Sequence, residues 1–217
     1  MKKVVKKLLI ISSLFIVGSL IGFAFENVLT IFKGKEVLRK GLIYSPFIPV
    51  YGAGLLLLFG VYSKINFKKK NIIKEIIIIF ILGFILGGIT EYLFSYLQEK
   101  IFGTISWDYS YLKYNFDGRT SIFHMCIWGL LSVIFYELIL PILKKGIKLL
   151  DNKIIRLILI IISIFVLLDI IISTVACLRR EERRNNIMPN NKAEELLDKY
   201  YPDNYIDSIF NNAKVVK

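Results

Sequence analysis

Long apolar stretches alternate with short basic segments along this chain of 217 residues. Five of the stretches match the roughly 20 apolar residues that cross a bilayer core as a helix. No recurring alternation of apolar and polar residues indicates the strands of a membrane barrel. The pattern therefore predicts an all-α polytopic transmembrane bundle of about five spans. The stretches cover residues 8–32, 41–62, 76–97, 120–143 and 157–178.

The second stretch differs from the others because it contains Pro46 and Pro49. Proline removes a backbone donor and disfavours helix in the residue before it. Residues 41–62 therefore either span the membrane or form a re-entrant segment packed against protein. The second alternative leaves four full spans and places both termini in the cytoplasm.

Composition supports a membrane protein, since 55% of the residues are hydrophobic and the mean hydropathy is +0.60. The basic start followed by an apolar run is also typical of a signal peptide. However, this run is longer than the apolar core of a signal peptide, so we expect a retained first span. Cys126 and Cys177 show neither metal-ligand spacing nor a disulfide framework, and the sequence predicts no cofactor.

The net charge of +12 is concentrated around the apolar stretches. Residues 179–217 hold eight Lys or Arg against seven Asp or Glu. Cations beside membrane spans contact lipid headgroups and set topology, so we expect lipid partners and no nucleic acid. The expected localisation is the cell membrane.

Topology follows from the distribution of Lys and Arg between alternate loops. With five spans and a cytoplasmic N-terminus, fourteen of these residues lie inside and eleven outside. The preference for this orientation is small. The run Arg179-Arg180-Glu181-Glu182-Arg183-Arg184 argues against it, because such clusters prefer the cytoplasm.

The sequence divides into a transmembrane bundle over residues 1–178 and a polar tail over residues 179–217. Within the tail, Asn190 and Asn191 indicate a break and a helix N-cap. A short polar helix over 192–200 follows and is stopped by Pro202, and a second short piece covers 205–210. Such a tail is too small for its own core, so we expect it on the membrane surface or on another protein.

Four carboxylates lie within the apolar stretches, at Glu26, Glu91, Glu137 and Asp169. An ionised group at mid-bilayer costs at least about 2.5–3.5 kcal/mol, so such residues usually face a partner, a cavity or a pathway. Glu137 lies near the basic residues at a span end and is expected to reach them. Asp169 lies one helical turn before Ser173, and this pair is a candidate for helix packing.

Two polar signatures follow the first and third stretches, and each opens with a membrane glutamate. Glycines, prolines and aromatic residues then form a bent connection beside the membrane. No catalytic pairing of nucleophile and base and no metal site is predicted. The candidate site residues are Glu26, Arg39, Tyr44 and Tyr51 in the first signature, and Glu91, Trp107, Asp108, Tyr109, Asn115, Arg119 and His124 in the second.

Asp108 and Arg119 are expected charge partners, because arginine grips a carboxylate with two parallel hydrogen bonds. We also expect Arg39, Asp108 and Arg119 to be the nearest partners of the two membrane glutamates. The competing interpretation is that both signatures are rigid interfacial loops with ordinary membrane-belt aromatics.

The two signatures share an order of features. Each has a helix with small residues, then its glutamate, then a basic residue beside glycine, then a glycine-containing helix. This order predicts a parallel internal repeat of two helices, formed by stretches 1–2 and 3–4, with a fifth span added.

The block Pro46-Phe47-Ile48-Pro49-Val50-Tyr51-Gly52 and the block Trp107-Asp108-Tyr109-Ser110, followed by Asn115 and Gly118-Arg119, resemble one known family. This is the CmpB-like family of type IV ABC-transporter permeases, and the resemblance covers roughly residues 14–175. It implies a permease subunit of a transport system whose polar cluster binds or passes a solute. Arg119-Thr120-Ser121 departs slightly from the family pattern.

The sequence contains no phosphate-binding G-x-x-x-x-G-K-[ST] motif, so an ATPase would be a separate chain. We therefore expect an ATP-binding subunit or another membrane protein as partner, and an oligomer. Two further hypotheses stay open. One is a non-catalytic partner or regulator of another membrane protein, and the other is a membrane-embedded enzyme acting on lipid headgroups, with Arg119 holding phosphate.

Overall fold

The computed structural model describes residues 3–32, 34, 41–65, 67 and 71–216. The fold is an all-α helical membrane bundle with two minimal antiparallel strand pairs. The bundle helices are α1 (Lys3–Phe32), α2 (Pro49–Tyr62), α3 (Ile72–Phe102), α4 (Ile122–Ile134), α5 (Leu140–Gly146) and α6 (Lys153–Arg184). The tail contains α7 (Lys192–Tyr200) and α8 (Asp203–Ile209), and the strands are β1 (Thr104–Ile105), β2 (Asn115–Phe116), β3 (Thr120–Ser121) and β4 (Lys214–Val215).

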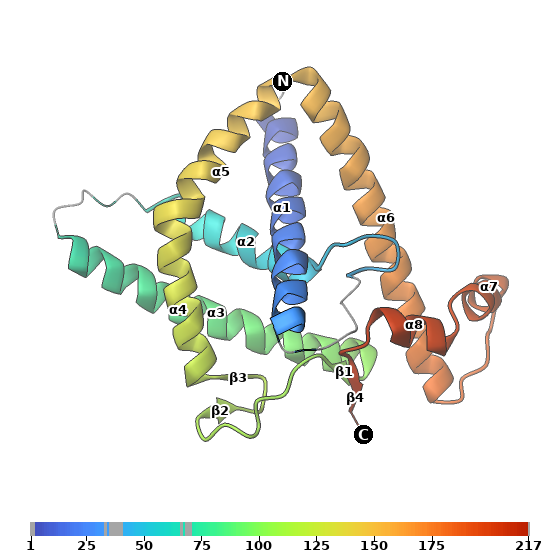
Figure 1. Cartoon of the computed structure of the whole chain (residues 1–217). Coiled ribbons are helices and arrows are strands. Elements are labelled where there is room, and N and C mark those ends of the chain that lie inside the picture. Colours follow the sequence, from blue (N-terminus) through green and yellow to red (C-terminus); the bar gives the residue numbers. More distant parts are fainter. Residues whose placement is uncertain (1–2, 33, 35–40, 66, 68–70, 217) are drawn as a thin grey trace.

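Four helical segments of the described chain are long and apolar enough to cross a membrane, not the five full spans expected first. The second apolar stretch contains the shorter helix α2, of 14 residues, which corresponds to a length of about 21 Å. Its first helical residue is Pro49, and residues 41–48 before it form a loop. The prolines therefore shorten this helix. The start of α1 and the tail nevertheless lie at opposite ends of the bundle, so the part of that alternative that places both termini on one side is wrong (Figure 1).

The fourth span is continuous but not regular. A π-helical turn over Phe135–Ile139 joins α4 to α5, and Pro141 is the second residue of α5. Proline cannot donate to the carbonyl four residues earlier and clashes with it in a regular α-helix. The wide turn accommodates this defect, which is a common cause of such bulges.

Helices α1 and α2 form an antiparallel hairpin with very close contact. A Cβ added at Gly22 would lie 2.2 Å from Cγ of Tyr51, and one added at Gly18 would lie 2.8 Å from Cβ of Leu55. One added at Gly52 would lie 2.6 Å from the carbonyl oxygen of Phe15. Glycine is therefore required at the contact, because any side chain would separate the two backbones.

Helices α3 and α4 form a second hairpin with matching contacts. Gly87 lies under the Trp128 ring, and a Cβ added there would lie 2.2 Å from Cγ of Trp128. A Cβ added at Gly83 would likewise overlap the Ser132 side chain. Gly129 contacts the ring of Phe80. In the first helix of each hairpin, an aromatic residue lies seven positions before the second glycine: Phe15 before Gly22, and Phe80 before Gly87. In the second helix, the ring of Tyr51 or Trp128 packs on that glycine. These paired contacts support the internal two-helix repeat that the sequence predicts.

The segment containing β2 and β3 lies at the end of the bundle toward which α6 and the tail run (Figure 1). The loop before α2 lies beside the middle of α6, where the Tyr44 N–H donates to Asp169. The N-terminal part of α1 lies at the opposite end, where Lys6 Nζ donates to Asp151 Oδ1 over 3.5 Å. An apolar cluster containing Tyr62, Ile79 and Phe135 connects α2, α3 and the fourth span.

The tail packs on the bundle end. Helix α6 continues without a break to Arg184, and Asn191 caps α7 by accepting a hydrogen bond from the Glu194 N–H. Ile206 and Ile209 of α8 pack against Ala176 and Cys177 of α6. Strand β4 pairs with β1, which directly follows α3. The expected helix over 192–200 is therefore present, and the second short piece begins at Asp203.

The helix contacts at glycine predict opposite effects for two Gly→Ala substitutions. Gly87→Ala should lower the free energy of unfolding by about 1–3 kcal/mol, the usual cost of overpacking, because its Cβ has no room beside Trp128. Gly60→Ala on α2 meets no atom within 4 Å and should be neutral or stabilise by up to about 1 kcal/mol. Thermal unfolding in detergent measures both. Equal melting temperatures for the two variants would contradict the close contact.

Candidate functional site

Glu91 is the centre of the polar cluster at the end of the second hairpin. One carboxylate oxygen accepts from the Tyr109 hydroxyl over 3.0 Å, and the other accepts from the Thr120 hydroxyl over 2.7 Å. The side chain of Trp128, whose ring lies on Gly87, lies beside the carboxylate. The carboxylate therefore receives donors from the loop and from β3, and these interactions offset its removal from water.

Glu26 occupies the matching position in the first hairpin. Its carboxylate accepts from the Tyr51 hydroxyl over 2.6 Å, and Tyr51 is the aromatic residue seated on Gly22. Tyr51 and Trp128 therefore occupy matching positions, each on a glycine and beside a glutamate. In both hairpins the glycine that admits the aromatic ring lies one helical turn before the glutamate.

Tyr109 connects the two glutamates electrostatically. Its half-buried ring stacks on His124, with ring centroids 3.7 Å apart and an angle of 16° between the planes. Burial raises the pKa of Tyr109 well above its ordinary value, and the negative charges of Glu91 and, more weakly, Glu26 raise it further. Carboxylates from both hairpins thus act on one phenol.

His124 is fixed at the start of α4. Its Nδ1 lies 2.8 Å from the hydroxyl oxygen of Ser121, and that hydroxyl also accepts from the His124 backbone N–H as the N-cap of the helix. One face of the imidazole is covered by the Tyr109 ring. The Phe123 ring packs edge-on against the imidazole, with ring centroids 5.4 Å apart. The histidine therefore belongs to the same cluster as Glu91.

Arg119 pairs with Glu99 of α3, so the expected pair with Asp108 is wrong. The guanidinium also donates to Ser95 Oγ over 3.4 Å. It lies 5.8 Å from the ring centroid of Tyr92 and 5.4 Å from that of Tyr96, within the range of cation–π attraction. Glu99 lies one turn beyond Ser95 on the same face of α3, which is why it can reach Arg119.

Asp108 instead shapes its own loop. Its Oδ1 accepts from the Ser110 N–H over 2.9 Å, and this hydrogen bond lowers the pKa of Asp108. The carboxylate also lies against Gly118, where an added Cβ would be 2.6 Å from Oδ1. Gly118 has a φ of +67°, so glycine suits both the backbone conformation and the close contact.

Two more predicted residues fix this loop. Trp107 donates from Nε1 to the Arg119 carbonyl over 2.8 Å. Asn115 accepts from the Gly118 N–H over 2.8 Å and donates to the Leu112 carbonyl over 2.6 Å. The loop between α3 and α4 is thus held by internal hydrogen bonds, and it presents Tyr109 to Glu91.

The loop before α2 is held by a buried carboxylate, that of Asp169 in α6. Its oxygens accept from the Tyr44 N–H over 3.1 and 3.3 Å and from the Ser45 hydroxyl. Ser173, one turn further along, donates to Asp169 over 3.3 Å and accepts from the Ile43 N–H over 3.1 Å. Asp169 and Ser173 therefore lock the loop onto α6.

Two further residues that the sequence singled out, Tyr44 and Glu137, lie outside the Glu91 cluster. The Tyr44 hydroxyl lies 2.6 Å from that of Tyr201 in the tail, away from the Glu91 cluster. Glu137 is exposed on the π-helical turn. The prediction for Arg39 falls outside the described residues. The residues near Glu91 are therefore Tyr109, Thr120, His124 and Trp128, and not Asp108 or Arg119.

Several contacting residues were not among the predicted site residues. Thr120, Trp128 and Glu99 belong to this class. Helical spacing contained a signal for Glu99, because Glu91, Ser95 and Glu99 recur every four residues on one face of α3. Thr120 carried no signal, since its contact depends on the path of the loop.

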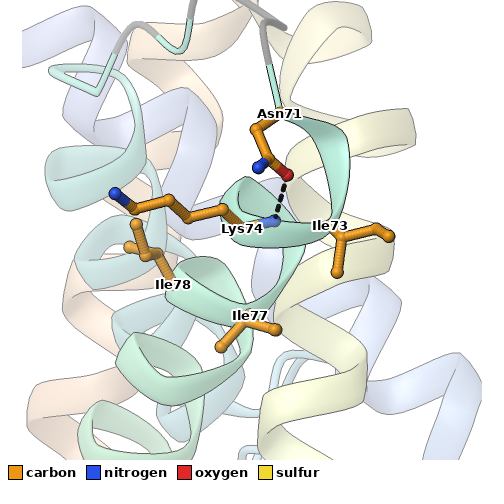
Figure 2. A pocket seen from close by; sticks show the side chains of 5 residues that line it. All are labelled: Asn71, Ile73, Lys74, Ile77 and Ile78. Carbon is orange, nitrogen blue, oxygen red and sulfur yellow. Dashed lines mark hydrogen bonds between the residues drawn. The ribbon is translucent and has the colours of Figure 1, made fainter.

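A hollow of about 450 Å³ at the start of α3 is not part of this cluster (Figure 2). Its lining is apolar apart from Asn71 and Lys74, and the hydrogen bond drawn there is the N-cap from the Lys74 N–H to Asn71 Oδ1 over 3.0 Å. Such a surface suits acyl chains better than a polar solute. The other lining residues are Ile73, Ile77 and Ile78.

The polar cluster offers carboxylate acceptors beside aromatic rings. Among the described residues, no group of three or more His, Cys, Asp or Glu side chains could hold a metal ion. Glu91 suits a ligand with hydrogen-bond donors, because such a group can replace the hydroxyl donors that its oxygens now have.

A model of the family described as "Putative ABC-transporter type IV" matches residues 13–174. The match covers both hairpins and most of α6, and it ends before the arginine run of α6 and the tail. No curated protein and no solved structure matches this chain.

The role of Glu91 as an acceptor predicts that Glu91→Ala loosens the loop between α3 and α4. Two donors, the hydroxyls of Tyr109 and Thr120, would lose their acceptor, at about 1–3 kcal/mol each if they stay buried. Hydrogen–deuterium exchange should then increase over residues 107–121. Glu75→Ala, in the first turn of the same helix, is the matched control and should leave that segment unchanged. An unchanged exchange pattern in the Glu91 variant would refute this role.

Asp169→Ala should release the loop before α2, because the Tyr44 N–H and the Ser45 hydroxyl lose a buried acceptor. Hydrogen–deuterium exchange over residues 41–48 should rise. Ser163→Ala is the control on the same helix, since its hydroxyl donates only within α6, to the Leu159 carbonyl. If both variants exchange alike, Asp169 does not hold the loop.

Proposed function

The chain belongs to the type IV ABC-transporter family, and we propose that it serves as the membrane-spanning permease subunit of a transport system. A separate ATP-binding chain supplies the energy, because this sequence has no phosphate-binding motif of its own. The polar cluster of Glu91, Tyr109 and His124, together with Glu26, binds or passes the solute.

One observation carries this proposal: each hairpin has a membrane glutamate that accepts a tyrosine hydroxyl, Glu26 from Tyr51 and Glu91 from Tyr109. A carboxylate is costly within a membrane span, so such residues usually face a partner, a cavity or a pathway. Two helical hairpins that meet at a polar centre are an arrangement that transporters with internal repeats use for solute binding. A small relative movement of the hairpins would change the distance between the two carboxylates.

Charge distribution supports a cytoplasmic N-terminus, with the polar cluster on the outer side of the cell membrane. The arginine run at the end of α6 had argued against this orientation. Its guanidinium groups pair with tail carboxylates, for example Arg179 with Asp198 and Arg180 with Asp207. Acidic partners contribute little to the positive-inside rule, so the preference for a cytoplasmic N-terminus stays small.

The ATP-binding subunit would then contact the opposite end of the bundle, around the start of α1 and the turn between α5 and α6. This end contains the basic residues Lys144, Lys145 and Lys148. The alternative function, a partner or regulator that uses its charged tail, loses its main support. The tail carboxylates contact the arginines of the same chain.

The proposal predicts that the double variant Glu26→Gln/Glu91→Gln inserts normally and fails to transport. Both amides keep the shape of the side chain but lose the negative charge that acts on Tyr109. The measurement compares the metabolite content of a deletion strain complemented with the variant or with the parent chain. The double variant should leave the solute pool as it is in the deletion strain.

Glu137→Gln is the matched control, because it removes a carboxylate from a span outside the cluster. It should restore the pool fully. Crosslinking of the full chain in cells should recover an ATP-binding protein with the parent chain and with both variants. Full complementation by the double variant, or recovery of no ATP-binding protein, would refute the proposal.

A further inference from the structure

The tail contacts three parts of the bundle that are distant in sequence. Tyr201 reaches Tyr44 in the loop after α1, where the two hydroxyl oxygens lie 2.6 Å apart. Strand β4 pairs with β1, which follows α3. Helices α7 and α8 contact the end of α6. The tail therefore links the first hairpin, the second hairpin and α6 at the polar end.

A network of arginines and carboxylates forms the contact with α6. Arg179 grips Asp198 with two hydrogen bonds, from Nε over 2.9 Å and from Nη2 over 3.0 Å. Arg183 also donates to Asp198, over 2.5 Å, and to Asp203 over 2.7 Å. The Arg179 side chain is only 2% exposed, so its charge depends on these partners. The guanidinium groups of Arg179 and Arg183 lower the pKa of Asp198.

An apolar contact lies beside this network. Ile206 is fully buried and Ile209 is 4% exposed, and both pack over Ala176 and Cys177 on α6. Ile43 from the loop after α1 belongs to the same cluster. Helices this short are marginal on their own in water, so the tail helices depend on this docking.

We propose that residues 185–216 form a latch that closes the polar end of the bundle by docking on the arginine face of α6. The latch is reversible because exposed carboxylates hold it in place: Asp203 is 44% exposed and Asp207 is 53% exposed. Salt screens such pairs more than it screens buried ones. Opening of the latch uncovers Cys177 and frees Tyr44, and it thereby loosens the loop that leads into α2.

The two native cysteines provide the test in the full-length protein. Cys177 is 8% exposed and lies beneath the latch, whereas Cys126 is half-buried on α4 and serves as an internal reference. The probe is N-ethylmaleimide, and the rate of modification at each cysteine is followed by mass spectrometry. In the double variant Asp198→Asn/Asp203→Asn, the rate at Cys177 relative to Cys126 should rise at least about tenfold, because modification proceeds through the open state.

Two features make the outcome specific. Asp207 is left intact, because its charge acts directly on the Cys177 thiol. Asp151→Asn is the matched control, since it removes an exposed carboxylate that pairs with Lys6 at the opposite end. This variant should label like the parent chain.

A salt series on the parent chain gives an independent readout that needs no substitution. The ratio of the Cys177 rate to the Cys126 rate should rise as sodium chloride is raised from 50 mM to 1 M. The proposal is overturned if Cys177 stays protected in the double variant. The double variant can also expose both cysteines together, in which case the salt series on the parent chain decides. A parent-chain ratio that does not change with salt then overturns the proposal.

Discussion

The close contact of paired helices at glycine fixes the positions of the two membrane glutamates, Glu26 and Glu91. Gly22 and Gly87 each admit an aromatic ring from the neighbouring helix. The Tyr51 hydroxyl donates to Glu26, one turn beyond Gly22, and Trp128 lies beside Glu91, one turn beyond Gly87. Without the glycines the rings would be displaced, and the carboxylates would lose the donors that offset their desolvation.

Further polar contacts build on this arrangement. The loop between α3 and α4 is rigid enough to bring Tyr109 to Glu91, because Trp107, Asp108 and Asn115 fix its backbone. Asp169 performs the corresponding task for the loop after α1, from a different helix. The two loops are therefore positioned by unlike means although the hairpins match. This asymmetry fits a bundle in which only one loop reaches the shared centre.

The long helices could be predicted from the sequence because the membrane demands unbroken apolar runs, and Pro46 and Pro49 indicated where the second run would be irregular. Asn191 and Pro202 marked the ends of the first tail helix for equally local reasons. The partner of Arg119 could not be predicted, because the choice between Asp108 and Glu99 depends on the path of the loop. The docking of the tail likewise depends on pairs far apart in sequence.

The pKa of the Tyr109 phenol tests the central claim most directly, since both glutamates are held to act on it. The measurement is a titration by ¹⁹F NMR of the full chain with a fluorotyrosine at position 109. We expect Glu91→Gln to lower this pKa and Glu26→Gln to lower it by a smaller amount. A titration that Glu26→Gln leaves unchanged would contradict the claim that the two hairpins share one polar centre.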